Sequence, residues 1–234
     1  MERTKRVEML LGGAAAERLM RSRVAVVGLG GVGSWCAEAL CRSGIGSLTL
    51  IDSDLVAESN INRQLEALGS TVGQPKAEAL AARLRDIAPE ADIRPVTALY
   101  NAGNRGVLPD GLDYVADCID LVSCKLDLIE TALRRGVPII SALGTGSKLD
   151  AQRLRITDLA ETSGCPFARV MRRELRRRGI EHLDVVFSDE PAHGCEQLEA
   201  PPPGRRSVPG SVVWVPAAAG LLMAQRIVLA LAEA

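Results

Sequence analysis

A short apolar run, Val24-Ala25-Val26-Val27, leads directly into the glycine-rich stretch Gly28-Leu29-Gly30-Gly31-Val32-Gly33. The run predicts a fully buried β-strand, and the glycines after it fit the pattern G-x-G-x-x-G. The first glycine of this pattern permits a tight turn, the second lets the backbone approach a phosphate, and the third allows a helix to pack closely on the strand. The start of that helix offers free N–H groups to an anion. The feature therefore indicates a nucleotide-binding α/β fold.

Strands and helices alternate along the first 145 residues, after a mildly helical opening at 1–22. Apolar spacing and turn residues predict strands at 24–27, 47–51, 93–96, 114–119 and 137–141, and helices at 31–43, 75–87 and 123–135. This order predicts a Rossmann-like, doubly wound and mostly parallel sheet.

The alternation of strands and helices stops further along the chain. Prolines and glycines, among them Pro201-Pro202-Pro203-Gly204, predict an irregular insertion over residues 146–210. Long loops of this kind usually meet a substrate. We therefore expect one domain over 1–234, with a nucleotide-binding core at 1–145, a substrate-facing insertion at 146–210, and a closing strand and terminal helix at 211–234.

Composition narrows the class of protein. The six cysteines include no C-x-x-C pair, so a four-thiolate zinc site is not expected, and no apolar signal region opens the sequence. We predict a cytoplasmic protein.

Pro216 and Arg226 interrupt the apolar stretch 212–232, which is therefore expected to be a buried helix rather than a membrane span. Cys165 and Cys195 fall in the irregular insertion, with His193 close in sequence to Cys195, so a reactive thiol stays an alternative there.

Charged residues follow the predicted strand ends. Asp52 lies where a carboxylate can accept hydrogen bonds from a ribose, and Asp120 follows a later strand at the same sheet edge, where a magnesium-binding role fits. Arg63 and Lys76 supply two fixed cations. A nicotinamide dehydrogenase would share the glycine pattern, but hydride transfer does not call for these cations. Attack of a carboxylate on an α-phosphate does, because negative charge accumulates there.

These motifs together resemble the adenylation core shared by ubiquitin-activating enzymes and the bacterial activators of sulfur-carrier proteins. The resemblance covers residues 20–145 closely and is carried by Gly28-x-Gly30-Gly31-x-Gly33, Asp52-x-Asp54, Asn60-x-Asn62-Arg63-Gln64, Gly73-x-x-Lys76 and Asp117-Cys118-x-Asp120. It implies that ATP is bound by Gly28, Gly30, Gly31, Gly33, Asp52, Asp54, Asn60, Asn62, Arg63, Gln64, Lys76 and Asp120. It further implies that Asp52 binds the ribose, that Asn62, Arg63 and Lys76 contact the phosphates, and that Asp120 positions Mg²⁺. Arg63, Lys76 and Asp120 are the expected catalytic residues.

Further phrases identify a branch of this family. Gly31-Val32-Gly33-Ser34-Trp35, Arg42-Ser43-Gly44-Ile45-Gly46, Ile156-Thr157-Asp158-Leu159-Ala160, Val186-Phe187-Ser188-Asp189-Glu190 and Gly210-Ser211-Val212-Val213 resemble the tRNA threonylcarbamoyladenosine dehydratases. The resemblance implies ATP-dependent cyclisation of a threonylcarbamoyl group on an anticodon-loop adenosine. It also implies a homodimer, in which Arg3 or Arg6 reaches a neighbouring nucleotide site, and allows a monovalent cation. The alternative is an adenylyltransferase or sulfurtransferase that activates a ubiquitin-like sulfur carrier, with a sulfur-transfer protein as partner.

A run of arginines lies within the predicted insertion. Arg169, Arg172, Arg173, Arg176 and Arg177 alternate with Val170, Met171 and Leu175, so a helix here would bury one edge and present guanidinium groups on the other. Such a surface suits tRNA phosphates. A solvated basic helix with no ligand is the alternative interpretation.

Overall fold

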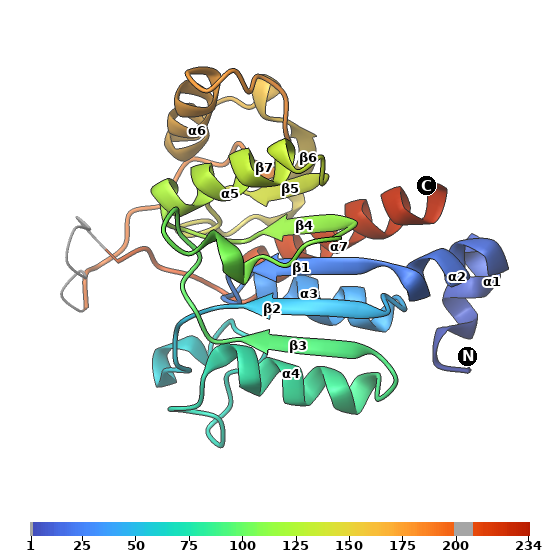
Figure 1. The fold of residues 1–234 in the computed structure, drawn as a ribbon. Coiled ribbons are helices and arrows are strands. Elements are labelled where there is room, and N and C mark those ends of the chain that lie inside the picture. Colours follow the sequence, from blue (N-terminus) through green and yellow to red (C-terminus); the bar gives the residue numbers. More distant parts are fainter. Residues whose placement is uncertain (1, 199–207) are drawn as a thin grey trace.

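The computed structural model describes residues 2–198 and 208–234, and a single seven-stranded sheet organises them (Figure 1). The strands are β1 (Arg23–Val27), β2 (Ser47–Ile51), β3 (Asp92–Val96), β4 (Tyr114–Asp117), β5 (Ile139–Ala142), β6 (Leu154–Asp158) and β7 (Asp184–Ser188). Their order is β3-β2-β1-β4-β5-β7-β6, and every neighbouring pair is parallel except β6 and β7. This is the predicted Rossmann-like, doubly wound sheet.

Helices cover both faces of the sheet. They are α1 (Lys5–Leu11), α2 (Gly13–Arg21), α3 (Gly33–Arg42), α4 (Lys76–Ile87), α5 (Val122–Arg134), α6 (Pro166–Arg176) and α7 (Trp214–Glu233), with short 3₁₀ turns η1 (Glu2–Thr4), η2 (Glu58–Asn60), η3 (Arg105–Val107), η4 (Ala151–Arg153) and η5 (Leu159–Glu161). Side chains alternate across a strand, so Val24 and Val26 face one core while Ala25 and Val27 face another. The first core joins the sheet to α2, α3, α4 and α7, and the second joins it to α5 and α6.

The terminal helix α7 lies in the first core. By length and composition it could cross a membrane, but 56% of that span is buried inside the protein. A Cβ atom at Gly220 would lie 2.4 Å from the carbonyl oxygen of Val32, so glycine allows α7 to approach the start of α3 very closely. This is the packing of a core helix, as the interruptions by Pro216 and Arg226 predict.

The structure differs from the prediction in the C-terminal third. Residues 146–210, expected to be irregular, contain β6, α6 and β7, while Pro201-Pro202-Pro203-Gly204 lies outside the described residues. The expected closing strand after residue 211 does not form, because residues 208–213 have no regular structure and α7 begins at Trp214. β6 is an edge strand with one buried residue, Leu154, so its apolar signal is weak.

Candidate nucleotide site

A cavity of about 760 Å³ opens at the carboxyl edge of the parallel strands. Its walls come from the glycine turn after β1, residues 52–54 after β2, residues 118–121 after β4 and residues 142–146 at the end of β5. In Figure 1 the arrowheads of β1, β2 and β3 point toward this edge, away from the N-terminal helices. Parallel α/β sheets bind ligands at this edge, where strand order reverses.

Ten of the twelve residues predicted to bind the nucleotide line this cavity. They are Gly28, Gly30, Gly31, Asp52, Asp54, Asn60, Arg63, Gln64, Lys76 and Asp120. Gly33 and Asn62 are not part of the wall. Asn62 instead braces it, because its Nδ2 donates to the carbonyl oxygen of Ser211 at 3.0 Å and its Oδ1 accepts from Arg63 at 2.8 Å. The individual binding roles stay predictions, but the fold brings the residues together.

Backbone geometry explains two of the glycines. Gly28 has φ +87°, a conformation that side chains disfavour, and its Cβ would lie 2.8 Å from the carbonyl oxygen of Cys118. A Cβ at Gly33 would lie 1.8 Å from the carbonyl oxygen of Gly28. The turn therefore closes tightly against β4 and against the start of α3, which leaves the backbone of Gly30 and Gly31 at the cavity wall.

Asp52 is fixed by two backbone N–H groups. Its Oδ2 accepts from Leu29 at 2.6 Å and its Oδ1 accepts from Asp54 at 2.8 Å. Burial raises the pKa of Asp52, while these hydrogen bonds and the nearby Lys76 oppose that rise. The carboxylate is thus held at the end of β2 beside the glycine turn, as a ribose contact requires.

Two cations flank the cavity. Lys76, the first residue of α4, has a side chain only 8% exposed, and its Nζ lies 3.0 Å from Oδ2 of Asp54, which is 66% exposed. Arg63 donates to the carbonyl oxygen of Ser59 at 2.9 Å and to Asn62. The Lys76 ammonium is oriented by Asp54 at the cavity wall, and the Arg63 guanidinium by Ser59 and Asn62 beside it, so both cations have fixed positions at the cavity.

A buried ion pair beneath the cavity was missed by the sequence analysis. Lys125 and Asp117 are both fully buried, with Nζ to Oδ2 at 2.7 Å, and the Ser141 hydroxyl contacts the same atoms at 3.0 and 2.7 Å. This network joins α5 to the ends of β4 and β5, from which two cavity walls start. The sequence does contain a sign of this ion pair. Lys125 shares a helix face with the buried residues Leu128, Ile129 and Ala132, and a lysine on an apolar face indicates a buried charge that needs a partner.

The side wall after β3 was also missed. Leu99 and Tyr100 line the cavity, and the Tyr100 hydroxyl donates to Asp127 at 3.0 Å. Burial raises the pKa of Tyr100 to about 12, so the hydroxyl keeps its proton at neutral pH. Arg105 binds the same carboxylate, Nε to Oδ1 at 3.0 Å. The segment after β3 is thereby tied to α5 as an apolar wall.

The arginine run forms a helix, as predicted. α6 buries Ala168, Met171 and Leu175, and a second hollow of about 470 Å³ is lined by Arg169, Arg172, Arg173, Arg176 and Arg177. The structure adds a carboxylate that the sequence analysis left out. Glu174 accepts from Arg173 at 2.9 Å and from Arg177 at 3.1 Å, which offsets part of the positive charge. Arg172 is partly engaged as well, because it donates to the carbonyl oxygen of Thr162 at 2.5 Å.

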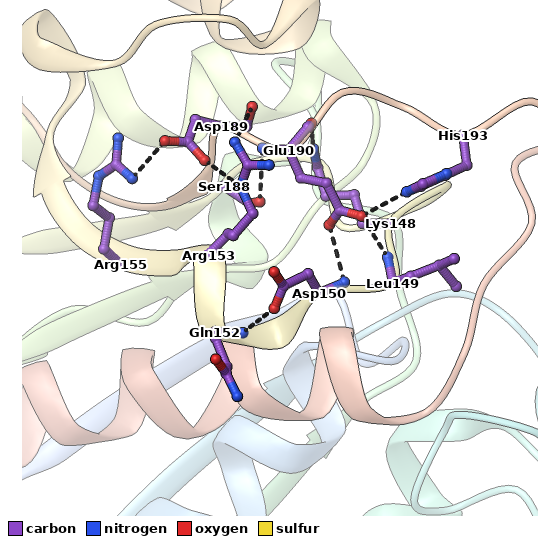
Figure 2. Close-up of polar contacts among 10 residues, drawn as sticks. All are labelled: Lys148, Leu149, Asp150, Gln152, Arg153, Arg155, Ser188, Asp189, Glu190 and His193. Carbon is purple, nitrogen blue, oxygen red and sulfur yellow. Dashed lines mark hydrogen bonds and ion pairs between the residues drawn. The ribbon is translucent and has the colours of Figure 1, made fainter.

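Cys195 and His193 do not contact each other in the described part of the chain. Cys165 is buried in the second core, whereas Cys195 is exposed. The His193 ring points instead at Glu190, with Nε2 to Oε1 at 2.8 Å (Figure 2). Glu190 also accepts from the backbone N–H groups of Leu149 and Asp150 at 3.0 and 3.1 Å. Glu190 therefore braces the loop that follows the cavity wall at 142–146.

The fold and the site define a class: an α/β protein of the nucleotide-binding type, whose cavity is lined by carboxylates and by two cations. The chain belongs to the ThiF family, whose model matches residues 4–233. This confirms the resemblance identified from the motifs.

The chain is similar to members of the branch identified from the sequence, the tRNA threonylcarbamoyladenosine dehydratases. The chain is 41% identical to the tRNA threonylcarbamoyladenosine dehydratase of Bacillus subtilis (strain 168) over 234 residues, 96% of this chain and 92% of that protein. The structure of the E. coli tRNA N6-threonylcarbamoyladenosine dehydratase in complex with ATP matches with a TM-score of 0.89 at 34% identity, over 99% of this chain and 94% of that chain. The molybdopterin-synthase adenylyltransferase of Escherichia coli (strain K12) is 37% identical over a shorter span, 67% of this chain and 61% of that protein. The alternative function, activation of a sulfur carrier, is therefore supported only by more distant similarity.

Proposed function

We propose that the protein catalyses ATP-dependent cyclisation of threonylcarbamoyladenosine in the anticodon loop of tRNA. The observation that carries the proposal is the meeting of Asp52, Arg63, Lys76 and Asp120 in one cavity at the carboxyl edge of the sheet. The similarity to dehydratases over nearly the whole chain favours this substrate over a protein carrier.

The chemistry needs positioning and charge stabilisation more than an enzymic nucleophile. The substrate carboxylate attacks the α-phosphate, and pyrophosphate leaves as the bond between the α- and β-phosphates breaks. The tethered carbamoyl group then attacks the activated carbonyl carbon, loses a proton and expels AMP. Arg63 and Lys76 offset the negative charge that develops in the first step. Because the nucleophile is already tethered, proximity supplies much of the acceleration of the second step.

Asp120 fits a magnesium ion that arrives with the nucleotide. Asp120 lines the cavity, and no group of three or more His, Cys, Asp or Glu residues that could hold a metal occurs in the described ranges 2–198 and 208–234. Mg²⁺ commonly binds through one or two carboxylates together with substrate phosphates. The ion would neutralise phosphate charge and support departure of pyrophosphate.

Nucleoside mass analysis tests the proposed function. Total tRNA from a strain that lacks the gene should contain threonylcarbamoyladenosine, and complementation should convert it to a product lighter by the mass of one water. The purified enzyme should form AMP and pyrophosphate in proportion to this product. If AMP formation depends on a small carrier protein ending in Gly-Gly and ignores modified tRNA, the alternative function is correct.

We further propose that the hollow on α6 binds tRNA phosphates. Arg173 and Arg177 have side chains 62% and 67% exposed, and guanidinium groups suit phosphate through paired N–H donors. α6 also reaches the cavity, because Phe167 lines its wall. A phosphate backbone that follows the arginines would therefore pass close to the nucleotide site.

Reversing two charges on α6 should weaken tRNA binding. With Arg173→Glu and Arg177→Glu together, we expect tRNA affinity to fall by about 10-fold or more at low salt, and the salt dependence of binding to flatten, since fewer counterions are released. ATP affinity should not change. Filter binding at several salt concentrations measures the first effect and calorimetry the second. Arg21→Glu, an exposed change on α2, is the control. Unchanged tRNA affinity and salt slope would reject the tRNA role of α6.

The N-terminal helices favour a homodimer of the kind that the resemblance implies. On α1, Met9 and Leu10 are 80% and 85% exposed, which leaves two large apolar side chains without cover in a single chain. Arg3 pairs with Glu90 and with the carbonyl oxygen of Cys41 in its own chain, so the proposed reach into a neighbouring site falls to Arg6. We propose a cytoplasmic homodimer, and sedimentation of wild type against Leu10→Glu tests the contact.

A further inference from the structure

Glu66 is a buried carboxyl group without a hydrogen-bond partner. It is 2% exposed, and neither carboxylate oxygen has a partner in the described part of the chain. Its backbone is fixed, because the Glu66 carbonyl oxygen accepts from Thr71 Oγ1 at 2.6 Å and Thr71 Oγ1 in turn accepts from Leu68 N at 2.9 Å. An unsatisfied buried polar group is rare in folded proteins and calls for an explanation.

The groups around Glu66 belong to the nucleotide site. Lys76 on α4, Asp52 after β2 and Ser34 on α3 are its charged and polar neighbours. The Ser34 hydroxyl donates to the carbonyl oxygen of Gly30 at 2.8 Å and accepts from Leu65 N at 3.2 Å, so its proton is committed to the glycine turn. Lys76 donates to Asp54. Among the described residues, Glu66 thus has electrostatic interactions with Lys76 and Asp52, while its own backbone N–H and the Ser34 hydroxyl lie near its carboxylate without meeting hydrogen-bond geometry.

Burial, and to a smaller extent the charge of Asp52, raise the pKa of Glu66 to about 7, although its own backbone N–H, the charge of Lys76 and the Ser34 hydroxyl oppose the rise. Near neutral pH the group therefore exists in both protonation states. The ionised state places a negative charge in a poorly hydrated region next to the lysine that faces the cavity. Electrostatic interactions are strong in such surroundings.

We propose that Glu66 is a positioning residue that acts through Lys76 and couples nucleotide binding to proton uptake. When Glu66 is neutral, the Lys76 ammonium interacts with Asp54 and with the nucleotide phosphates. An ionised Glu66 competes for that ammonium and repels the phosphates. By linkage, a bound polyphosphate favours the neutral acid, so binding takes up a proton at Glu66. This proposal rests on the proposed function, because it takes ATP as the ligand of the cavity.

The experiment compares ATP binding by wild type and Glu66→Gln from pH 6 to pH 8.5 at fixed Mg²⁺ and ionic strength. Glutamine keeps the shape of the neutral acid and cannot ionise. For wild type relative to Glu66→Gln, we expect the ratio of Kd values to rise by about 10-fold between pH 6 and pH 8, since an ionising group changes affinity by up to 10-fold per pH unit. Protonation of ATP itself cancels in this ratio.

Calorimetry in buffers of different ionisation enthalpy gives a second readout that needs only the wild type. ATP binding near pH 7 should take up a fraction of a proton, and Glu66→Gln should remove that fraction. Glu58→Gln, an exposed change in the same segment, should behave as wild type. Parallel pH profiles for wild type and Glu66→Gln, with equal proton uptake, would overturn the role of Glu66 while leaving ATP binding established. A wild type that binds no ATP would instead refute the proposed function.

Discussion

Replacing Asp120 by asparagine is expected to lower the rate of cyclisation by about 100-fold or more, with the fold unchanged. Asp120 lines the cavity in the segment that follows β4, and asparagine keeps its size but removes the charge that would hold the metal against the phosphates. Turnover is measured as loss of one water from threonylcarbamoyladenosine in purified tRNA, with the circular dichroism spectrum recorded alongside.

Asp110→Asn is the matched control for this change, because Asp110 is 97% exposed and lies outside the cavity. The same pair of variants in a strain lacking the gene should show an accumulated precursor with Asp120→Asn only. Full activity of Asp120→Asn over a range of Mg²⁺ concentrations would contradict the assigned role of this carboxylate.

Replacing Lys125 by methionine is expected to destabilise the protein by about 3–5 kcal/mol, because it leaves the carboxylate of Asp117 buried without its counter-charge. For a chain of this size, that loss corresponds to a fall in Tm of roughly 6–20 °C. Thermal unfolding followed by circular dichroism measures the change.

The double variant Lys125→Met with Asp117→Asn separates the two contributions. It removes both charges and keeps most of the volume, so a large part of the lost stability should return. If the single and double variants unfold at the same temperature, the destabilisation comes from packing around Lys125 and not from the stranded charge.

The first 145 residues could be predicted closely because local signals and tertiary structure agree there. β2 occupies 47–51 as predicted, and α4 and α5 begin and end within one residue of the expected positions. Buried parallel strands are continuous apolar runs, and clear signals flank two of them here, because Gly28 follows β1 and β2 lies between Gly46 and Asp52. Motif spacing then placed Asp52, Lys76 and Asp120 at one sheet edge, since the carboxyl ends of parallel strands meet there.

The features that the sequence did not predict depend on contacts between residues that are far apart in the chain. β6 pairs with β7 across more than twenty residues, and the alternation of Leu154 and Ile156 with polar residues is too short to identify the strand without that partner. The ion pair of Lys125 with Asp117 and the contact of Tyr100 with Asp127 likewise join separate elements. Glu66 follows the motif Asn60-x-Asn62-Arg63-Gln64, but its burial appears only once α3 and α4 pack around it.

The placement of Phe167 and the arginines on one helix has a mechanical consequence. An eleven-residue helix moves nearly as a rigid rod, and the first turn of α6 forms part of the cavity wall while its later turns carry the basic side chains. If α6 binds an RNA strand as proposed, any shift of this helix toward the RNA moves the Phe167 ring relative to the nucleotide cavity. Binding of the tRNA and the shape of the cavity would then be coupled through this one helix.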